Sequence, residues 1–532
     1  MRPLFCLLAT CSLPSFLPAL LSANDVTPVS QVAEAAETAP NVPDGASDNA
    51  DANASSEPKP ANGEIDVRDA VVKVHVSQRS PDFIRPWTKG RSQQSSGSGV
   101  IISGNRILTN AHVVLYASRV HVQGNQSSKR VLAKVVAVAP EVDLALLELK
   151  DASFFEGKPA LEISNELPQL KNTINVYGFP IGGEQMSVTE GIVSRIECAR
   201  IAYTGVGLRL QIDAALNPGN SGGPAIANGK IVGLAFSGIK TADNIGYVIA
   251  AEELTRFLGH INEHGEYTGK RAMFDGTQTV ENEALRNWLK LDDEQGGLVV
   301  TSPYEKDGPL KKMDVVTKLG DHELDRKGYV QITDDTKLNY QYVIPHLDND
   351  GKVPATIIRD GETMEIEIPV HTGRDLLIPV LAGNYPSYFI HGPILFTTPS
   401  QEFLKQIRYA AISLANLESP LINRSVERPS EPGHQLVIVG PRLFTHATSE
   451  GYQGTGLGVV ETIDGTEVKS LAHAAELLQT GTDEYVKIEL KGCATRLLTF
   501  RRDEIADATE EILEDEGIRS QFSDDLDDVF EN

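Results

Sequence analysis

A serine lies inside a tight, glycine-rich turn in the sequence Asn217-Pro218-Gly219-Asn220-Ser221-Gly222-Gly223-Pro224. Glycine adopts backbone conformations with positive φ that other residues avoid, so these glycines let neighbouring N–H groups point toward one place. Two such groups, the N–H of Gly219 and the N–H of Ser221, can stabilise a negatively charged oxygen in a transition state. The turn therefore predicts a nucleophilic serine with an oxyanion hole.

Two further motifs supply the groups that a nucleophilic serine needs. The first is Thr109-Asn110-Ala111-His112-Val113-Val114, and the second is Asp143-Leu144-Ala145-Leu146-Leu147, which opens an apolar run with one carboxylate. A serine hydroxyl attacks an amide only when a neutral histidine takes its proton, and that histidine needs a carboxylate to orient it. Each motif alone is typical of an ordinary core or loop. Together they predict His112 as general base, Asp143 as its orienting carboxylate and Ser221 as nucleophile.

The three motifs lie in a β-rich segment. Between residues 65 and 260, about ten short runs of β-branched and apolar residues are separated by Gly, Pro and Asn clusters, and this spacing favours a sandwich or barrel. The expected strands are 71–76, 99–102, 131–138, 144–149, 173–178, 192–196, 208–212, 225–226, 230–237 and 246–249. Two later segments, 265–375 and 376–502, each mix short strands with one helix.

The charge of the chain excludes one class of function and is concentrated at the two ends. The 532 residues include 73 acidic and 48 basic side chains, a formal net charge of −25, which argues against a nucleic-acid binder. Residues 503–532 hold thirteen acidic residues and one basic residue, and residues 24–64 hold eight and one. We predict a disordered acidic spacer over 24–64 and an acidic tail over 503–532, in which a weak amphipathic helix from Glu504 fades into a solvated end. The tail either solubilises the protein or docks a partner.

The first 23 residues have the pattern of a secretory signal peptide: one arginine, an apolar run and small residues at the end. A buried N-terminal helix is the alternative. Pro14 and Pro18 interrupt the run, so we expect no membrane span, and the context of Cys11 disfavours a lipid anchor. Export would place the protein in a periplasm or cell envelope. The four cysteines indicate neither a disulfide framework nor a metal site, and no cofactor is expected.

On these motifs, residues 65–264 resemble the protease domain of the HtrA/DegP family. The motifs at Tyr177–Gly182, Val188–Ser194 and Gln211–Ala215 add to the resemblance, and the layout of the chain is most similar to plant-type Deg proteases. The resemblance implies a chymotrypsin-like double β-barrel, then one PDZ domain over 265–375 and one divergent PDZ-like domain over 376–502. The fold class is then mainly β with α+β C-terminal modules.

The PDZ resemblance departs from the family pattern in one motif. The family's Gly-Leu-x-x-Gly-Asp motif appears as Gly308-Pro309-Leu310-Lys311-Lys312-Met313-Asp314, so that Met313 replaces the second glycine. A PDZ domain captures a peptide by adding it to a sheet as a strand. Peptide binding at the first PDZ domain therefore stays open, and the second is expected to serve assembly rather than peptide binding.

The resemblance also assigns a substrate cleft. Gly233, Leu234, Ala235 and Phe236 align with the family strand that pairs with the substrate backbone, and Ile249 belongs to the run that forms the pocket wall. An apolar wall favours a small or medium aliphatic side chain before the scissile bond. Ile249 fits an ordinary core position equally well.

The resemblance implies an exported, ATP-independent serine endopeptidase that hydrolyses unfolded or damaged proteins through an acyl-enzyme intermediate, in protein quality control and stress response. It implies a homo-oligomer built on trimers, with the insertion at residues 81–87 as a candidate contact. Two alternatives are a protease-fold chaperone and a scaffold that binds unfolded chains through its PDZ-like domains.

Overall fold

A computed structural model describes residues 66–200, 205–236 and 245–530. The predicted signal peptide and the whole predicted acidic spacer lie outside the described residues. In the described ranges, no helix is both long enough and apolar enough to cross a membrane.

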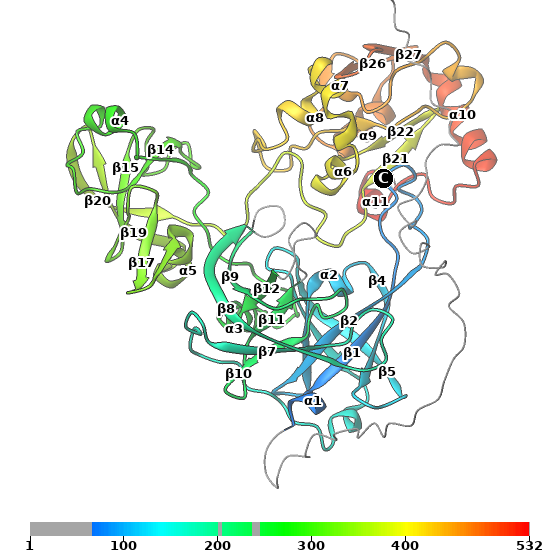
Figure 1. The fold of residues 1–532 in the computed structure, drawn as a ribbon. Coiled ribbons are helices and arrows are strands. Elements are labelled where there is room, and N and C mark those ends of the chain that lie inside the picture. Colours follow the sequence, from blue (N-terminus) through cyan, green and yellow to red (C-terminus); the bar gives the residue numbers. More distant parts are fainter. Residues whose placement is uncertain (1–65, 201–204, 237–244, 531–532) are drawn as a thin grey trace, which may run out of the picture. The chain divides into compact units, whose positions relative to one another are not determined.

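Residues 71–149 close into a six-stranded antiparallel barrel (Figure 1). The valines of the first strand are buried almost throughout, and the run Leu144–Leu147 of the last strand is buried on every residue, which is typical of a strand inside a packed core. The strand order is β1-β2-β3-β6-β5-β4, and β4 pairs with β1 to close the barrel. The elements are α1 (Val67–Ala70), β1 (Val71–Gln78), β2 (Gln93–Ile102), β3 (Arg106–Thr109), α2 (Ala111–Val114), β4 (Ala117–Gly124), β5 (Arg130–Ala139), β6 (Leu144–Leu149) and the 3-10 turn η1 (Ala152–Phe155).

A second six-stranded barrel follows, with the order β10-β11-β12-β9-β8-β7. One hydrophobic cluster joins the two barrels, because Ile226, Ile231, Leu234 and Ile249 of the second barrel pack with the core of the first. Two packed barrels of this kind are the predicted chymotrypsin-like architecture. The elements are β7 (Thr173–Gly178), β8 (Ser187–Arg200), β9 (Val206–Ile212), β10 (Pro224–Ala227), β11 (Lys230–Phe236), β12 (Gly246–Ala250) and α3 (Ala251–Gly259).

The third region is a small antiparallel sheet of order β13-β14-β15-β19-β20, with β16 paired to β15 and a separate β17-β18 hairpin. Apolar residues from these strands and from α5 form its own core. The elements are β13 (Gly276–Thr279), α4 (Glu283–Trp288), β14 (Leu298–Ser302), β15 (Val315–Leu319), β16 (His322–Glu323), β17 (Tyr329–Thr333), β18 (Thr336–Asn339), η2 (Tyr340–Tyr342), α5 (Ile344–Leu347), β19 (Lys352–Arg359) and β20 (Glu362–Pro369).

Met313 lies in the motif where the family pattern has glycine, and its backbone keeps the glycine-like conformation. Its φ is +78°, in the left-handed region that side chains other than glycine rarely adopt. The next residue, Asp314, is buried and accepts two hydrogen bonds from the Arg359 guanidinium, at 2.7 and 2.6 Å. This buried ion pair holds the turn in place although the residue at position 313 is unsuited to it.

The fourth region contains a sheet of order β21-β22-β23-β24-β26-β27, with β25 paired to β24 and several short helices around it. The strands are β21 (Tyr388–His391), β22 (Ile394–Thr397), β23 (Ile438–Val439), β24 (Val459–Ile463), β25 (Thr466–Glu467), β26 (Tyr485–Lys491) and β27 (Leu497–Arg501). The helices are α6 (Gln401–Gln406), η3 (Arg408–Ala410), α7 (Ala411–Asn416), α8 (Pro420–Asn423), η4 (Ala447–Ser449), α9 (Leu471–Thr480), α10 (Arg502–Asp515), η5 (Asp524–Leu526) and α11 (Asp527–Phe530).

The amphipathic helix predicted within 503–532 is present as α10, but the prediction that it fades into a solvated end is wrong. Helix α10 buries Ile505 and Ile512 in the core of the fourth region, and Leu526 joins the same cluster. Residues 521–523 lie along β21, where the Ile390 N–H donates to the Gln521 carbonyl at 2.9 Å. The acidic side chains occupy only the solvent-facing side of these elements, so the segment is both highly charged and folded.

The insertion predicted to contact another subunit has partners inside this chain. The Phe83 ring lies 5.7 Å from the Phe403 ring, and Trp87 lies 6.2 Å from Tyr388 and 5.7 Å from Phe444. The structure therefore accounts for both aromatic side chains of residues 81–87 within one chain, and the trimer contact stays a prediction.

Candidate active site

His112 lies on the one-turn helix α2, directly after strand β3. Ala111, Val113 and Val114 are buried and anchor the helix, whereas 44% of the His112 side chain is exposed. The anchor before the helix is polar: the Thr109 hydroxyl donates to the Ser98 carbonyl at 2.7 Å. The apolar neighbours thus fix the backbone and leave the imidazole facing outward.

Asp143 ends the turn between β5 and β6 and is buried, with 6% of the residue exposed. Its carboxylate accepts from the His112 backbone N–H at 2.9 Å and from the ring Nδ1 at 2.8 Å. The hydrogen bond to Nδ1 requires the proton on that nitrogen, which leaves Nε2 free to accept another. The backbone of Asp143 has φ +59°, a left-handed conformation that Asp tolerates better than most residues.

The electrostatics of the pair favour the charged imidazole. Burial disfavours a positive charge on His112, but the hydrogen bond and the negative charge of Asp143 outweigh it and raise the pKa of His112. A histidine with a raised pKa is a stronger base, provided that the pH keeps it neutral. The pair is therefore suited to accept a proton from a weak acid such as a serine hydroxyl.

Ser221 lies in the turn between β9 and β10, and the turn is tied to the strands on both sides. The Ser98 N–H donates to the Ser221 carbonyl at 2.8 Å, and the Gly222 N–H donates to the Ala235 carbonyl at 3.0 Å. Only glycine fits at position 222, because φ is +85° and a Cβ atom would lie 2.2 Å from the Ser98 carbonyl oxygen. The glycine-rich turn thus has a physical basis in close backbone packing.

Shared neighbours bring Ser221 to the His112–Asp143 pair. A Cβ atom on Gly97 would contact both the Val113 side chain and the Ser221 carbonyl oxygen, so the residue after His112 and the nucleophile turn pack on one point of β2. Among the hydrogen bonds of the described residues, none joins the Ser221 hydroxyl to the His112 ring. Such bonds are often long without substrate and tighten in the complex.

The oxyanion-hole geometry follows from planar peptide groups. The Pro218 carbonyl accepts from the Ile181 N–H at 2.8 Å, so the Gly219 N–H on the same peptide points the opposite way. The Asn220 carbonyl likewise accepts from the Gly223 N–H at 2.9 Å and turns the Ser221 N–H away. In the part of the chain that the structure describes, neither the Gly219 nor the Ser221 N–H donates to a protein acceptor.

Ser98 anchors the turn that contains Gly219 and Ser221, and it is not among the site residues predicted from the sequence. It is fully buried, and its hydroxyl donates to the Gly219 carbonyl at 2.8 Å while accepting from the Phe179 N–H at 2.8 Å. Its position between Gly97 and Gly99 is the signal that could have identified it, because glycines on both sides indicate close backbone approach.

The predicted substrate-binding residues divide into two groups. Phe236 is partly buried at the end of β11, and its ring lies edge-on to the His112 ring at 6.2 Å and 77°. Leu234 and Ile249 are fully buried, pair across β11 and β12, and belong to the core cluster that joins the barrels. Gly233 and Ala235 are also buried on β11, where the Ala235 N–H donates to the Gly223 carbonyl at 2.8 Å.

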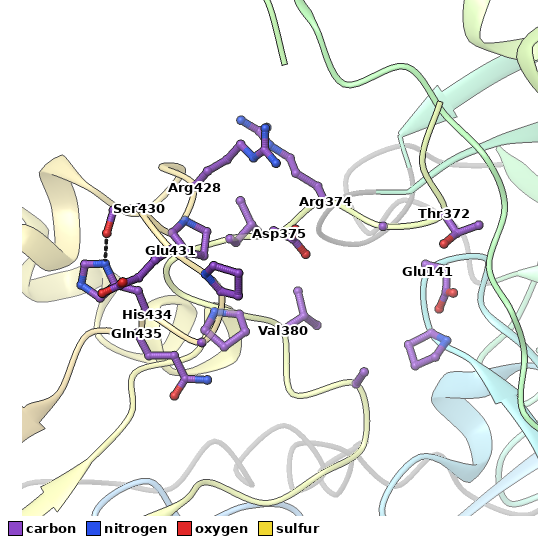
Figure 2. A pocket seen from close by; sticks show the side chains of 18 residues that line it. Glu141, Thr372, Arg374, Asp375, Val380, Arg428, Ser430, Glu431, His434 and Gln435 are labelled. Carbon is purple, nitrogen blue, oxygen red and sulfur yellow. Dashed lines mark hydrogen bonds between the residues drawn. The ribbon is translucent and has the colours of Figure 1, made fainter. Parts of the chain in front are cut away.

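A separate cavity of about 730 Å³ lies away from these residues. Figure 2 shows Glu141 on one side of it, with Arg374 and Arg428 reaching toward each other at another edge. Burial raises the pKa of Glu141, which stands two residues before Asp143. None of the triad residues lines this cavity. Within residues 66–200, 205–236 and 245–530, no group of three or more His, Cys, Asp and Glu side chains could hold a metal ion.

Comparisons with known proteins agree with this architecture. A family model described as a trypsin-like peptidase domain matches residues 97–234, and one described as a PDZ domain matches residues 379–525. The second match runs past residue 502, in agreement with the packed helix α10. It falls on the segment that we expected to be the more divergent of the two PDZ domains.

Two relatives from Arabidopsis thaliana match over most of their length. "Protease Do-like 4, mitochondrial" is 31% identical over 452 residues, which cover 84% of this chain and 83% of the relative. "Protease Do-like 2, chloroplastic" is 32% identical over 463 residues, 86% of this chain and 75% of the relative. The solved structure "HtrA-type protease AlgW with tripeptide" is 22% identical with a TM-score of 0.46, covering 58% of this chain and 95% of that chain. With relatives of this identity and coverage, the chain belongs to the HtrA/DegP family of trypsin-like serine proteases that carry PDZ domains.

Proposed function

We propose that this serine protease is an exported, ATP-independent endopeptidase that cleaves unfolded or damaged proteins through an acyl-enzyme intermediate. One observation carries the proposal: the Asp143 carboxylate accepts hydrogen bonds from both the backbone and the ring of His112, beside a turn with two unengaged N–H groups. In this role His112 is the general base, Asp143 orients it, and Ser221 is the nucleophile.

The chemistry follows from the proton positions. The Nε2 atom of His112 takes the proton of the Ser221 hydroxyl as its oxygen attacks the substrate carbonyl carbon. The N–H groups of Gly219 and Ser221 then stabilise the tetrahedral oxyanion, each contributing roughly 3–4 kcal/mol to the barrier reduction. His112 returns the proton to the leaving amine, and water hydrolyses the acyl-enzyme with the same base. No cofactor takes part in these steps.

The substrate class follows from the form of the cleft. Gly233, Leu234 and Ala235 are paired on both sides within the barrel, so the predicted pairing with substrate is kept only at the end of the strand. Among the described residues, Phe236 pairs with β12 alone, and its other edge would pair with an extended peptide. Only an unfolded segment can present its backbone in that way. Phe236 lies beside His112 and would contact the side chain near the scissile bond. Together with the apolar wall at Ile249, this favours small or medium aliphatic residues before the cut.

The site of action and the partners are part of the proposal. Residues 1–23 would direct export, with a periplasm or cell envelope as destination, and the names of the two relatives place those proteins in mitochondria and chloroplasts. The PDZ domains would bind peptides or mediate assembly of a trimer-based homo-oligomer. N-terminal sequencing of the mature protein after cell fractionation tests the export proposal. Light scattering on a deletion of residues 81–87 tests the trimer contact.

The central experiment combines labelling with cleavage. A serine-directed phosphonate should label the wild-type protein and not Ser221→Ala, and unfolded casein should be cut only by the wild type. A natively folded, compact protein serves as the control substrate and should resist. Equal casein cleavage by both proteins would contradict the assignment of Ser221. Suppression of aggregation without any cleavage by the wild type would favour the chaperone alternative.

A further inference from the structure

Arg209 is a buried cation of the second barrel that the proposed chemistry does not use. It lies on β9 with 3% of the residue exposed, which is rare for arginine. Its Nη2 lies 3.5 Å from the Val142 carbonyl oxygen, and Nη1 lies 3.5 Å from the Leu208 carbonyl oxygen. Because Val142 directly precedes Asp143, this guanidinium reaches across the barrel interface to the backbone that presents the catalytic carboxylate.

A second contact connects Arg209 to the catalytic histidine. The guanidinium carbon lies 5.3 Å from the centre of the Phe236 ring, a cation–π distance. The same ring stands edge-on to the His112 imidazole, with 6.2 Å between ring centres and an angle of 77°. Arg209, Phe236 and His112 thus form a row in which one aromatic ring separates a fixed positive charge from the catalytic base.

Two buried carboxylates act on the charge of Arg209, Glu253 more strongly and Asp143 second. The charged or titratable groups on the neighbouring elements are Asp143, Glu253, Lys270, Cys198 and the cross-strand Glu197. Glu253 already accepts from Lys270 Nζ at 2.6 Å and from the Leu208 N–H at 2.8 Å. Glu197 forms an ion pair with Arg195 at 3.0 Å. Burial raises the pKa of Cys198 to about 12, so its thiol is neutral.

We propose that Arg209 is a positioning residue for the His112–Asp143 pair. It keeps the His112 ring in its hydrogen bond to Asp143 and lowers the affinity of that ring for a proton. The inference rests on the proposed roles of His112 and Asp143. A fixed positive charge near Asp143 offsets part of the negative charge that stabilises the imidazolium, so His112 loses its proton at a lower pH. The protease then keeps a neutral base in more acidic surroundings than the pair alone would allow.

The test is the pH profile of kcat/KM on a peptide substrate, because a residue that merely supports the fold would not move it. Arg209→Met keeps the length of the side chain and removes the charge. We expect its acidic limb to move up by roughly half to one pH unit, which lowers kcat/KM at pH 6 by about three- to tenfold. Arg209→Lys keeps the charge and should leave the limb within about 0.2 units of the wild type.

A second neutral variant and a parallel labelling measurement complete the test. Arg209→Gln is neutral and polar, so it replaces the Met variant if that variant fails to fold. The proposal is supported if the acidic limb of the pH profile is shifted in Arg209→Gln and unshifted in Arg209→Lys. If the acidic limb of the kcat/KM profile lies at the same pH in the wild type and in all folded variants, the proposal is overturned. Phosphonate labelling of the wild type is measured in parallel, so that a failure of the proposed nucleophile is distinguished from a failure of the role of Arg209.

Discussion

Two histidines show how differently the barrel cleft and the fourth region use burial. His112 in the cleft has a half-exposed ring, a carboxylate at 2.8 Å and a raised pKa. His391 on β21 has its Nε2 shielded from solvent with no hydrogen-bond partner among the described residues, and burial, aided by the charge of Arg502, lowers its pKa to about 4. Asp143 favours protonation of His112 in the cleft, whereas burial keeps His391 of the fourth region neutral.

Because of this difference, substitutions in the two regions should have opposite consequences. The cleft depends on a few polar groups whose removal stops the reaction while the surrounding core stays packed. The fourth region depends on continuous apolar packing around β21, so a charge placed there should unfold it while the triad stays in place.

The largest expected effect is the loss of the reaction in Asp143→Asn. Asparagine tolerates the positive φ at this position as well as aspartate does, so the turn should persist. The amide no longer stabilises the imidazolium or fixes the Nδ1–H tautomer, and kcat should fall by about 10⁴-fold. Steady-state kinetics gives the loss, and thermal melting should show a nearly unchanged transition. A melting temperature that falls along with kcat would mean that Asp143 is mainly structural.

The second effect is the loss of fold in Ile505→Asp. Ile505 is fully buried on α10, and its side chain fills the space above Gly392. An unpaired carboxylate in this core should cost about 3–5 kcal/mol of unfolding free energy in the fourth region. The matched control is Ala506→Asp, which adds the same group at the next, exposed position and should change stability little. Urea unfolding measures both, and phosphonate labelling of Ser221 should continue in each folded protein.

The third effect is an acid sensitivity that comes from His391. Its unfolded-state pKa is about 6.5 and its folded-state pKa about 4, so the unfolded chain binds a proton that the folded one refuses. The stability contribution is fully present above pH 6.5 and is lost as the pH falls toward 4, by about 3 kcal/mol in total. Urea unfolding at several pH values should show this loss in the wild type. In His391→Gln the curve should be flatter by that amount, and parallel curves would contradict the prediction.

The features that could be predicted from the sequence are those carried by short, contiguous motifs. The motifs around His112, Asp143 and Ser221 each lie within a few residues, and the structure places the first two in direct hydrogen bonds. Strands β3 and β4 were not among the ten expected strands. Strand β3 has only four residues, and β4 alternates polar and apolar residues without a continuous β-branched pattern. The strand signals alone favoured a sandwich or barrel, and the two closed barrels were expected because the resemblance to the HtrA/DegP family implied them.

The misread parts depend on contacts between distant residues. Thirteen acidic residues in the last thirty led to the expectation of a solvated end after a weak helix, whereas Ile505, Ala508 and Ile512 are buried and Leu526 joins the core of the fourth region. Arg209 reads as an ordinary polar residue of a strand, and only its position against Val142, 67 residues earlier, shows what surrounds it. A high density of charged residues shows that one face of a segment is solvated. It does not show whether the other face of the same segment is packed against the protein.

The smallest expected effect is that of Ser98→Ala, which tests the cleft without touching a reacting group. The change leaves the Gly219 carbonyl and the Phe179 N–H, each bonded at 2.8 Å to the Ser98 hydroxyl, without a partner in a buried position. Unfolding free energy should fall by about 1–3 kcal/mol. Because the Gly219 carbonyl then loses its anchor, the adjoining N–H groups are less well aimed and kcat should fall by about tenfold with KM little changed. Ser98→Thr keeps the hydroxyl and should recover most of kcat if its methyl group is accommodated. A stability loss in Ser98→Ala without any change in kcat would show that the turn holds its shape independently of Ser98.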